Sequence, residues 1–207
     1  MYMNTELLLA VSKKQLEPYC GEGEEFIFQP MGELRLPTGE IVANDPCCMF
    51  ETKPFTRKVP AGAYPAEIWV LHSADDDKRI AFAALRFSDA EAVSFEMAIV
   101  DGVDVSKMEE NEYFGYGVDA GTGCFMDAAA CKVLLAAYNE DYELPVLAEP
   151  LEASYVDTYS AANVELGEGQ NIVAFSTGWG DGAYPSYWGL DKDCEICCLI
   201  TDFCIVE

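Results

Sequence analysis

A glycine-rich segment between Thr177 and Gly189 carries side chains suited to binding a ligand or a protein. It contains four glycines, two tryptophans, two tyrosines and one aspartate. Glycine lets another backbone approach closely, while Trp and Tyr present flat, partly polar surfaces. The predicted ligand- or partner-binding residues are Asp181, Trp179, Tyr184, Tyr187 and Trp188, together with Asp119 in a second glycine-rich segment. The alternative is a glycine-rich turn whose aromatic side chains pack inward.

The second segment, Gly115–Gly123, runs directly into a predicted helix. A turn of this kind can hold phosphate through backbone amides and the helix dipole. Here Asp119 and Asp127 flank the turn, no lysine follows the glycines, and the spacing matches neither the P-loop nor the dinucleotide fingerprint. The stretch Asp-Ala-Gly-Thr-Gly is similar to the aspartic protease motif, but no second copy supplies the carboxylate pair. We therefore predict no anion site here.

Three aspartates offer an alternative, catalytic interpretation. Hard divalent cations prefer clustered oxygen ligands, and a bound cation can activate water for hydrolysis. Asp119, Asp127 and Asp181 are the candidate ligands of such a metal-dependent hydrolase, provided that the fold brings them together. The ordered ligand spacing of a calcium loop is missing. Our first prediction is therefore a protein without a cofactor, with this metal site as the alternative.

The cysteines and the single histidine are predicted to be structural. A CxxC spacing occurs at Cys194 and Cys197, followed by Cys198. These residues lie at the start of a predicted strand, where residues three apart point to opposite faces and so could share a metal ion only if the chain turned there. Buried thiols are therefore favoured over a zinc site shared with Cys47 and Cys48. His72 is expected at the exposed end of a strand. The sequence does not decide between an enzyme and a binding protein.

Composition restricts the class of partner. Lys and Arg number 12 against 37 Asp and Glu, which gives a formal net charge of -25. Such a negative field repels phosphate backbones and anionic lipids, so neither nucleic acid nor membrane is expected as a partner. A basic protein or a small ligand fits better. Hydrophobic residues make up 51% of the chain, enough for a packed core.

The expected location is the cytoplasm. The opening residues MYMNTELLLAVSKK lack the basic region and the cleavage site of a secretory signal. No stretch approaches the roughly 20 apolar residues that span a bilayer. Nine cysteines, an odd number, favour reduced thiols over a disulfide framework.

The elements that must position these residues are mainly strands. A short helix is predicted from Thr5 to about Glu17, followed by strands from Phe26 to about residue 118 and a helix over residues 124–139. We predict an α+β, mainly β fold: an antiparallel bent sheet or β-sandwich, with this helix packed on it and a short N-terminal helix. Residues 1–207 are predicted to form one domain.

Two local patterns refine this prediction. Arg79–Phe87 and Val93–Val100 are predicted to form a tight antiparallel pair, with Arg86 opposite Glu96. The tetrapeptide Gly-Ala-Tyr-Pro occurs twice, at residues 62–65 and 182–185. Because the flanking sequences differ, shared turn chemistry explains this repetition.

Three motifs carry a resemblance to a known family. They are GELRLPTGEIVANDP, VDAGTGCFMD and GDGAYPSYWG, and with the strand ending Thr201-Asp202-Phe203 they cover most of the chain from Gly32 onward. The chain resembles a bacterial family, domain-of-unknown-function 4241. This resemblance implies a bacterial single-domain protein with the two glycine-rich segments as hallmarks. It implies no activity.

Two functions follow from these observations. The first is a non-catalytic binding or interaction protein, in one version an immunity- or antitoxin-like protein that neutralises a basic partner electrostatically. The second is the divalent-metal-dependent hydrolase described above. The first is preferred because the aromatic cluster and the acidity are present, whereas no nucleophile–base motif is.

Overall fold

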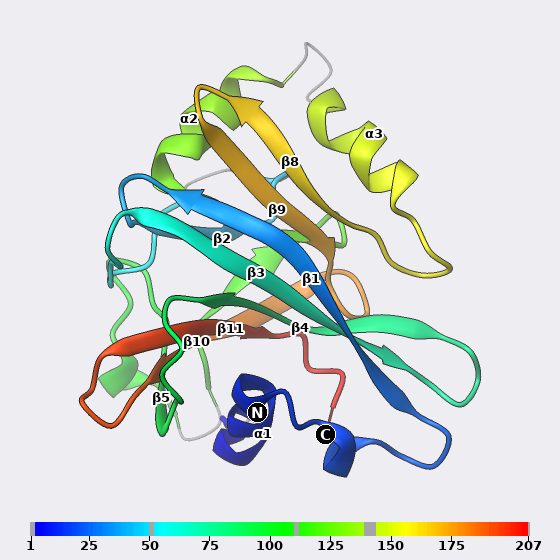
Figure 1. Cartoon of the computed structure of the whole chain (residues 1–207). Coiled ribbons are helices and arrows are strands. Elements are labelled where there is room, and N and C mark those ends of the chain that lie inside the picture. The colour runs from blue at the N-terminus through cyan, green and yellow to red at the C-terminus, as the bar shows by residue number, and fades with distance from the viewer. Residues whose placement is uncertain (1–2, 50–51, 110–111, 139–143, 207) are drawn as a thin grey trace.

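The computed structural model describes residues 3–49, 52–109, 112–138 and 144–206. Two antiparallel sheets pack face to face, and helices cover their outer faces (Figure 1). Helix α1 (Thr5–Lys13) packs on the larger sheet, while α2 (Ala128–Ala136) and α3 (Pro145–Ala153) pack on the smaller one. The mainly β, α+β prediction is confirmed. Among the described residues, no helix has the length and apolar character needed to cross a membrane.

The larger sheet has seven strands, all antiparallel. In spatial order they are β1 (Glu25–Leu36), β3 (Gly62–His72), β4 (Lys78–Arg86), β11 (Ile196–Asp202), β10 (Gly182–Leu190) and β5 (Ser94–Met97), and β6 (Gly115–Val118) also pairs with β10. Strands β5 and β6 pair with successive halves of β10. The N-terminal and C-terminal parts of the chain therefore meet at the centre of the sheet, between β4 and β11.

The smaller sheet has four strands and forms the second layer. Its order is β2 (Ile41–Asn44), β7 (Thr122–Asp127), β9 (Gln170–Ser176) and β8 (Ala161–Gly167). Side chains such as Leu85, Phe125 and Phe175 fill the space between the sheets. Strand β4 is apolar almost throughout because Phe82 and Ala84 face α1, while Ala83 and Leu85 face the smaller sheet.

Helix α1 is shorter than its pattern predicts. Asn4 caps its N-terminus by accepting a hydrogen bond from the Leu7 amide at 3.0 Å. The helix ends at Lys13, and Lys14 adopts the left-handed conformation (φ 57°) that terminates many helices. A separate 3₁₀ turn, η1, covers Glu17–Tyr19.

The second predicted helix begins later than expected. Cys124 to Asp127 belong to β7, because Cys124 pairs with Asn44 of β2 and with Ala174 of β9. Asp127 then caps α2 by accepting from the Ala129 amide at 2.8 Å. The predicted end, Asn139, lies outside the described residues. Helix α3 was not predicted, since Pro145 at its first turn and Pro150 within it resemble helix-ending signals.

The predicted pairing of residues 79–87 with 93–100 is wrong. Strand β4 pairs with β3 and β11, whereas β5 lies beyond β10. Arg86 therefore pairs with Glu67 of β3, at 2.8 Å between Nε and Oε2, and Glu96 pairs with Arg57. A short connection suggested a hairpin, but the chain after β4 crosses two strands before it re-enters the sheet.

Candidate functional site

The two glycine-rich segments lie side by side. Strand β6 pairs with the start of β10, so that Val118 is opposite Gly182. Beyond this pair, the Thr177 amide donates to the Gly121 carbonyl at 3.1 Å, and the Gly121 amide donates to Asp181 Oδ1 at 3.0 Å. Residues 119–121 and 177–181 therefore form one surface, which we call the paired turns.

A buried carboxylate supports the paired turns from within. Asp45 follows β2, is fully buried, and accepts from the amides of Asp119 (2.9 Å), Ala120 (2.7 Å) and Cys47 (2.8 Å). These three bonds satisfy a charge that burial would otherwise destabilise. Our sequence reasoning missed Asp45. The Asn-Asp-Pro run after a strand was the available signal, because Asp at such a position bonds amides that follow it.

The predicted binding residues fall into two groups. Asp119, Asp181 and Trp179 lie on the exposed surface of the paired turns, and the Trp179 side chain is 66% exposed. The Arg79 guanidinium lies 5.0 Å from the Trp179 ring centroid. Tyr184, Tyr187 and Trp188 are instead buried within the sandwich or beneath its outer layer.

The buried aromatic residues have structural partners. The Tyr184 ring packs edge-on against Phe203 at 5.2 Å, and its hydroxyl donates to the Gly180 carbonyl at 2.8 Å. The Trp188 ring lies 5.8 Å from that of Phe55. Of the four predicted aromatic contacts, Trp179 is therefore the one whose ring reaches the surface.

The three aspartates of the metal alternative do not converge. Asp127 is fully buried and accepts hydrogen bonds from the Thr38 amide, the Thr38 hydroxyl and the Ala129 amide at 2.8–3.0 Å. Asp119 and Asp181 are exposed. Within the described ranges, no three or more His, Cys, Asp or Glu side chains are grouped so that they could hold a metal ion.

Two thiols near the paired turns are poor nucleophiles. Cys47 is exposed by surface area, but partial loss of solvation around its thiol and the nearby Asp45 charge raise its pKa to about 11. Burial also raises the pKa of Cys48, and the charges of Asp45, Asp119 and Asp181 add to this effect. Since the thiolate is the reactive form, both side chains stay protonated at neutral pH.

His72 is the last residue of β3 and lies opposite Lys78 of β4, next to the turn of this hairpin. Its Nε2 atom is 2.7 Å from Asp76 Oδ1, and its Nδ1 atom is 3.4 Å from Glu25 Oε1. The Asp76 hydrogen bond raises the pKa of the imidazole. The carboxylate pairing explains this histidine without a catalytic role.

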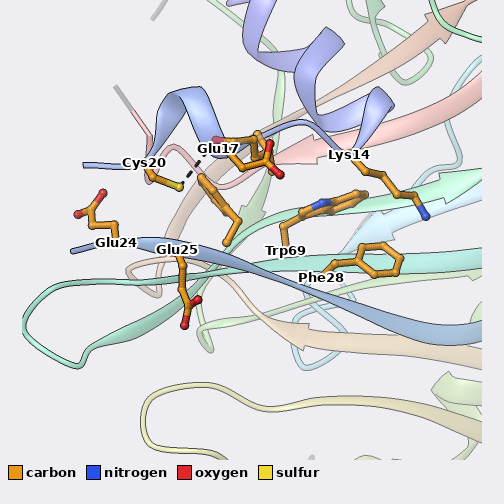
Figure 2. A pocket seen from close by; sticks show the side chains of 9 residues that line it. Lys14, Glu17, Cys20, Glu24, Glu25, Phe28 and Trp69 are labelled. Carbon is orange, nitrogen blue, oxygen red and sulfur yellow. Dashed lines mark hydrogen bonds between the residues drawn. The ribbon is translucent and has the colours of Figure 1, made fainter. Parts of the chain in front are cut away.

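A concave region lies next to α1. A pocket of about 460 Å³ opens between the segment that follows α1 and the strands β1 and β3 (Figure 2). Its walls include three aromatic side chains and three carboxylates: Phe26, Phe28, Trp69, Glu17, Glu24 and Glu25. We call this region the amino-terminal pocket. The Lys14 ammonium at its edge lies 4.0 Å from the Phe28 ring centroid.

Comparison with known proteins gave one match. The family described as "Protein of unknown function (DUF4241)" matches residues 34–201. Searches of curated proteins and of solved structures each found no match. The matched range contains the paired turns and Asp45. It begins after eight of the nine residues that line the amino-terminal pocket.

Proposed function

The chain belongs to the DUF4241 family, and on that premise we propose that it is a non-catalytic binding protein that recognises a basic partner protein through the paired turns. One observation carries this proposal. A tryptophan that is 66% exposed shares a hydrogen-bonded surface with two exposed carboxylates, Asp119 and Asp181.

The chemistry of this surface matches a basic partner. Exposed aromatic side chains are frequent anchors of protein interfaces, and Trp is the most enriched of them. Asp119 and Asp181 offer acceptors for Lys or Arg beside that anchor. The formal charge of -25 attracts a basic protein over a longer range and speeds its encounter.

The backbone of the paired turns is held before any partner arrives. Asp45 accepts hydrogen bonds from the Asp119 and Ala120 amides of the first turn. Asp181, in the second turn, accepts one from the Gly121 amide of the first. An interface that is already ordered loses less conformational entropy on binding. This support favours recognition by a fixed surface over recognition by a loop that folds on contact.

The chemistry near the surface favours binding over catalysis. Cys47 and Cys48 have raised pKa values, and the Asp127 carboxylate caps α2 and accepts from Thr38. Within the part of the chain that the structure describes, the metal-dependent hydrolase lacks a converging set of ligands. All nine cysteines are free thiols, which supports a cytoplasmic location for the partner and the protein.

Charge-matched variants test the proposal. The probe is a synthetic lysine- and arginine-rich peptide, titrated calorimetrically at low salt. Asp119→Asn with Asp181→Asn removes two charges, and Asn at position 181 still accepts from Gly121. Glu149→Gln with Glu152→Gln on exposed positions of α3 removes the same charge elsewhere.

We expect Trp179→Ala and the Asp119/Asp181 variant each to weaken peptide binding about ten-fold or more, because anchor residues contribute at least ~1.4 kcal/mol. The Glu149/Glu152 variant should change affinity less than about two-fold, because exposed charges away from the contact contribute little. Equal effects of the two double variants would show that the peptide responds to net charge alone, and the proposal would be wrong.

A further inference from the structure

The amino-terminal pocket combines an aromatic wall with carboxylates. Trp69 forms part of its floor, and the Phe28 ring packs edge-on against it at 5.5 Å with an interplanar angle of 62°. Figure 2 shows Trp69 and Phe28 next to each other, and Cys20, Glu24 and Glu25 on the opposite side of the pocket. A pocket of about 460 Å³ is within the range of small-molecule sites.

The charges that line this pocket favour a cation. Its lining includes three carboxylates, of Glu17, Glu24 and Glu25, and one ammonium, that of Lys14. Glu25 is partly engaged by His72 at 3.4 Å, while Glu24 accepts from the Gly21 amide at 2.8 Å. Both bonds leave further acceptor capacity, since each carboxylate has about four lone-pair sites.

Lys14 shows how this region holds an ammonium. Its Nζ atom lies 4.0 Å from the Phe28 ring centroid and 2.6 Å from Glu67 Oε1. The residue ends α1 in a left-handed conformation, with φ 57°. An aromatic face beside a carboxylate therefore already binds one cation here, supplied by the chain itself.

We propose that the amino-terminal pocket binds a small organic cation that carries an alkylated ammonium group. Aromatic faces attract such a group, and its alkyl substituents favour the apolar wall. A divalent metal ion would instead require several clustered oxygens, and an anion would meet three carboxylates. This site shares no residue with the paired turns, so the proposal does not rest on the proposed function.

Tetramethylammonium chloride is the probe, and NMR chemical shifts of the Trp69 indole and the β1 amides are the readout. Sodium chloride at the same ionic strength is the reference. We expect saturable shifts with tetramethylammonium alone. Shifts that do not saturate, or that sodium reproduces, would overturn the proposal.

Three variants locate the binding. Phe28→Leu and Glu17→Gln should each weaken binding about two- to five-fold, the effect of an exposed cation–π contact or of one nearby charge. Lys14→Met should strengthen binding by about the same factor, because it removes a competing ammonium. Phe28 is 41% exposed, so its replacement preserves the fold, and thermal unfolding verifies this.

Two controls separate this site from other interpretations. The Asp119/Asp181 and Glu149/Glu152 variants should bind tetramethylammonium as the wild type does. Unchanged binding in Phe28→Leu and Glu17→Gln, with a loss in either control, would assign the effect to the general acidity of the surface. Tighter binding of N-acetyl-lysine methylamide than of tetramethylammonium would overturn the proposal in favour of a protein side chain as the ligand.

Discussion

Two hairpins of the larger sheet begin with the same four residues but have different surroundings. Gly62-Ala63-Tyr64-Pro65 opens β3, and Gly182-Ala183-Tyr184-Pro185 opens β10. In both, the tyrosine hydroxyl donates to a carbonyl four residues earlier, that of Pro60 at 2.7 Å and that of Gly180 at 2.8 Å. The hairpins β3–β4 and β10–β11 are neighbours in the sheet, with β4 beside β11.

The difference lies in what packs against each opening. Strand β6 pairs with the start of β10, and Tyr184 is buried. The start of β3 pairs with the end of β1, and Tyr64 is half-buried against Phe87, with ring centroids 5.1 Å apart. The same tetrapeptide therefore makes the same local hydrogen bond in both places, whereas the neighbouring strand and the burial of the tyrosine differ. Shared turn chemistry, as predicted, accounts for the common hydrogen bond.

The largest effect should come from the buried ion pair of the first hairpin. The Arg86 side chain is 17% exposed, and Glu67 is 7% exposed. Arg86 also donates to the carbonyls of Ser12 (2.8 Å) and Val11 (3.1 Å) at the end of α1. Arg86→Ala should lower the free energy of unfolding by about 3 kcal/mol, because it breaks a buried ion pair and also removes the donor to the Ser12 and Val11 carbonyls. Urea unfolding measures this.

The second hairpin supplies the matching control. Its buried cross-strand pair is Ser186 with Thr201, whose hydroxyl oxygens are 2.7 Å apart. Ser186→Ala should cost only about 1 kcal/mol, because a neutral hydrogen bond contributes less than a buried charge pair. A loss for Arg86→Ala as small as that for Ser186→Ala would mean that solvent reaches Glu67.

The next largest effect should depend on pH. Asp202, at the end of β11, is 9% exposed, and burial raises its pKa from 3.8 to about 6. The folded protein therefore holds this proton more tightly than the unfolded chain does. Below about pH 4 the group has no effect on stability. Its ionisation lowers stability progressively between about pH 4 and 6, and by about 2–3 kcal/mol above that range.

Asp202→Asn should remove this effect. Asn still accepts from the Cys204 amide, which donates to Asp202 Oδ1 at 2.8 Å. We expect the variant to be about 2–3 kcal/mol more stable than the wild type at pH 8 and about equal at pH 4. Chemical unfolding across this pH range tests the prediction. A stability difference that does not vary with pH would contradict it.

A pair of glycines in β6 tests the packing of the second hairpin. A Cβ at Gly115 would lie 2.7 Å from the Tyr184 amide nitrogen, whereas a Cβ at Gly117 would meet no atom within 4 Å. Gly115→Ala should therefore destabilise the protein by about 2 kcal/mol, and Gly117→Ala by less than about 0.5 kcal/mol. Thermal unfolding distinguishes them. Similar melting temperatures would mean that β6 can move away from β10.

The smallest effect compares the two tyrosines directly. Tyr184→Phe should cost about 1–1.5 kcal/mol, because the Tyr184 hydroxyl is largely enclosed. Tyr64→Phe should cost about 0.5 kcal/mol or less, since water can replace its bond to Pro60. Parallel denaturation of the two variants measures the difference. Equal losses would show that the local turn, and not the neighbouring strand, determines the contribution of this hydrogen bond.

The local sequence pattern predicted where strands and helices lie better than it predicted which strands pair with each other. The buried character of β4 was evident from its apolar run, since both of its faces are covered. The partner of β4 was not evident, because β11 comes from the other end of the sequence and no short-range signal links them. Residues 124–127 read as helix because their spacing fits one, but pairing with β2 and β9 makes them a strand. That residues 1–207 form one domain stays a prediction.

The candidate site was predictable only in part, because its chemistry is visible in short segments whereas its long-range contacts are not. Asp119, Asp181 and Trp179 were chosen for their chemistry beside glycines, and each lies on the paired turns. The role of Asp45 depends on a contact with residues more than seventy positions away. Burial of Trp188 depends on Phe55 and Phe87, which sequence spacing does not link to it.

The junction of β4 with β11 has a consequence for the nascent chain. Ala84 pairs with Ile200, so the β3–β4 hairpin leaves the ribosome long before the strand that completes its edge. Until then, the apolar edge of β4 is an open template for pairing with other chains. Contacts so distant along the sequence also form slowly. Cover of that edge, for example by a chaperone, should therefore favour productive synthesis until β11 has emerged.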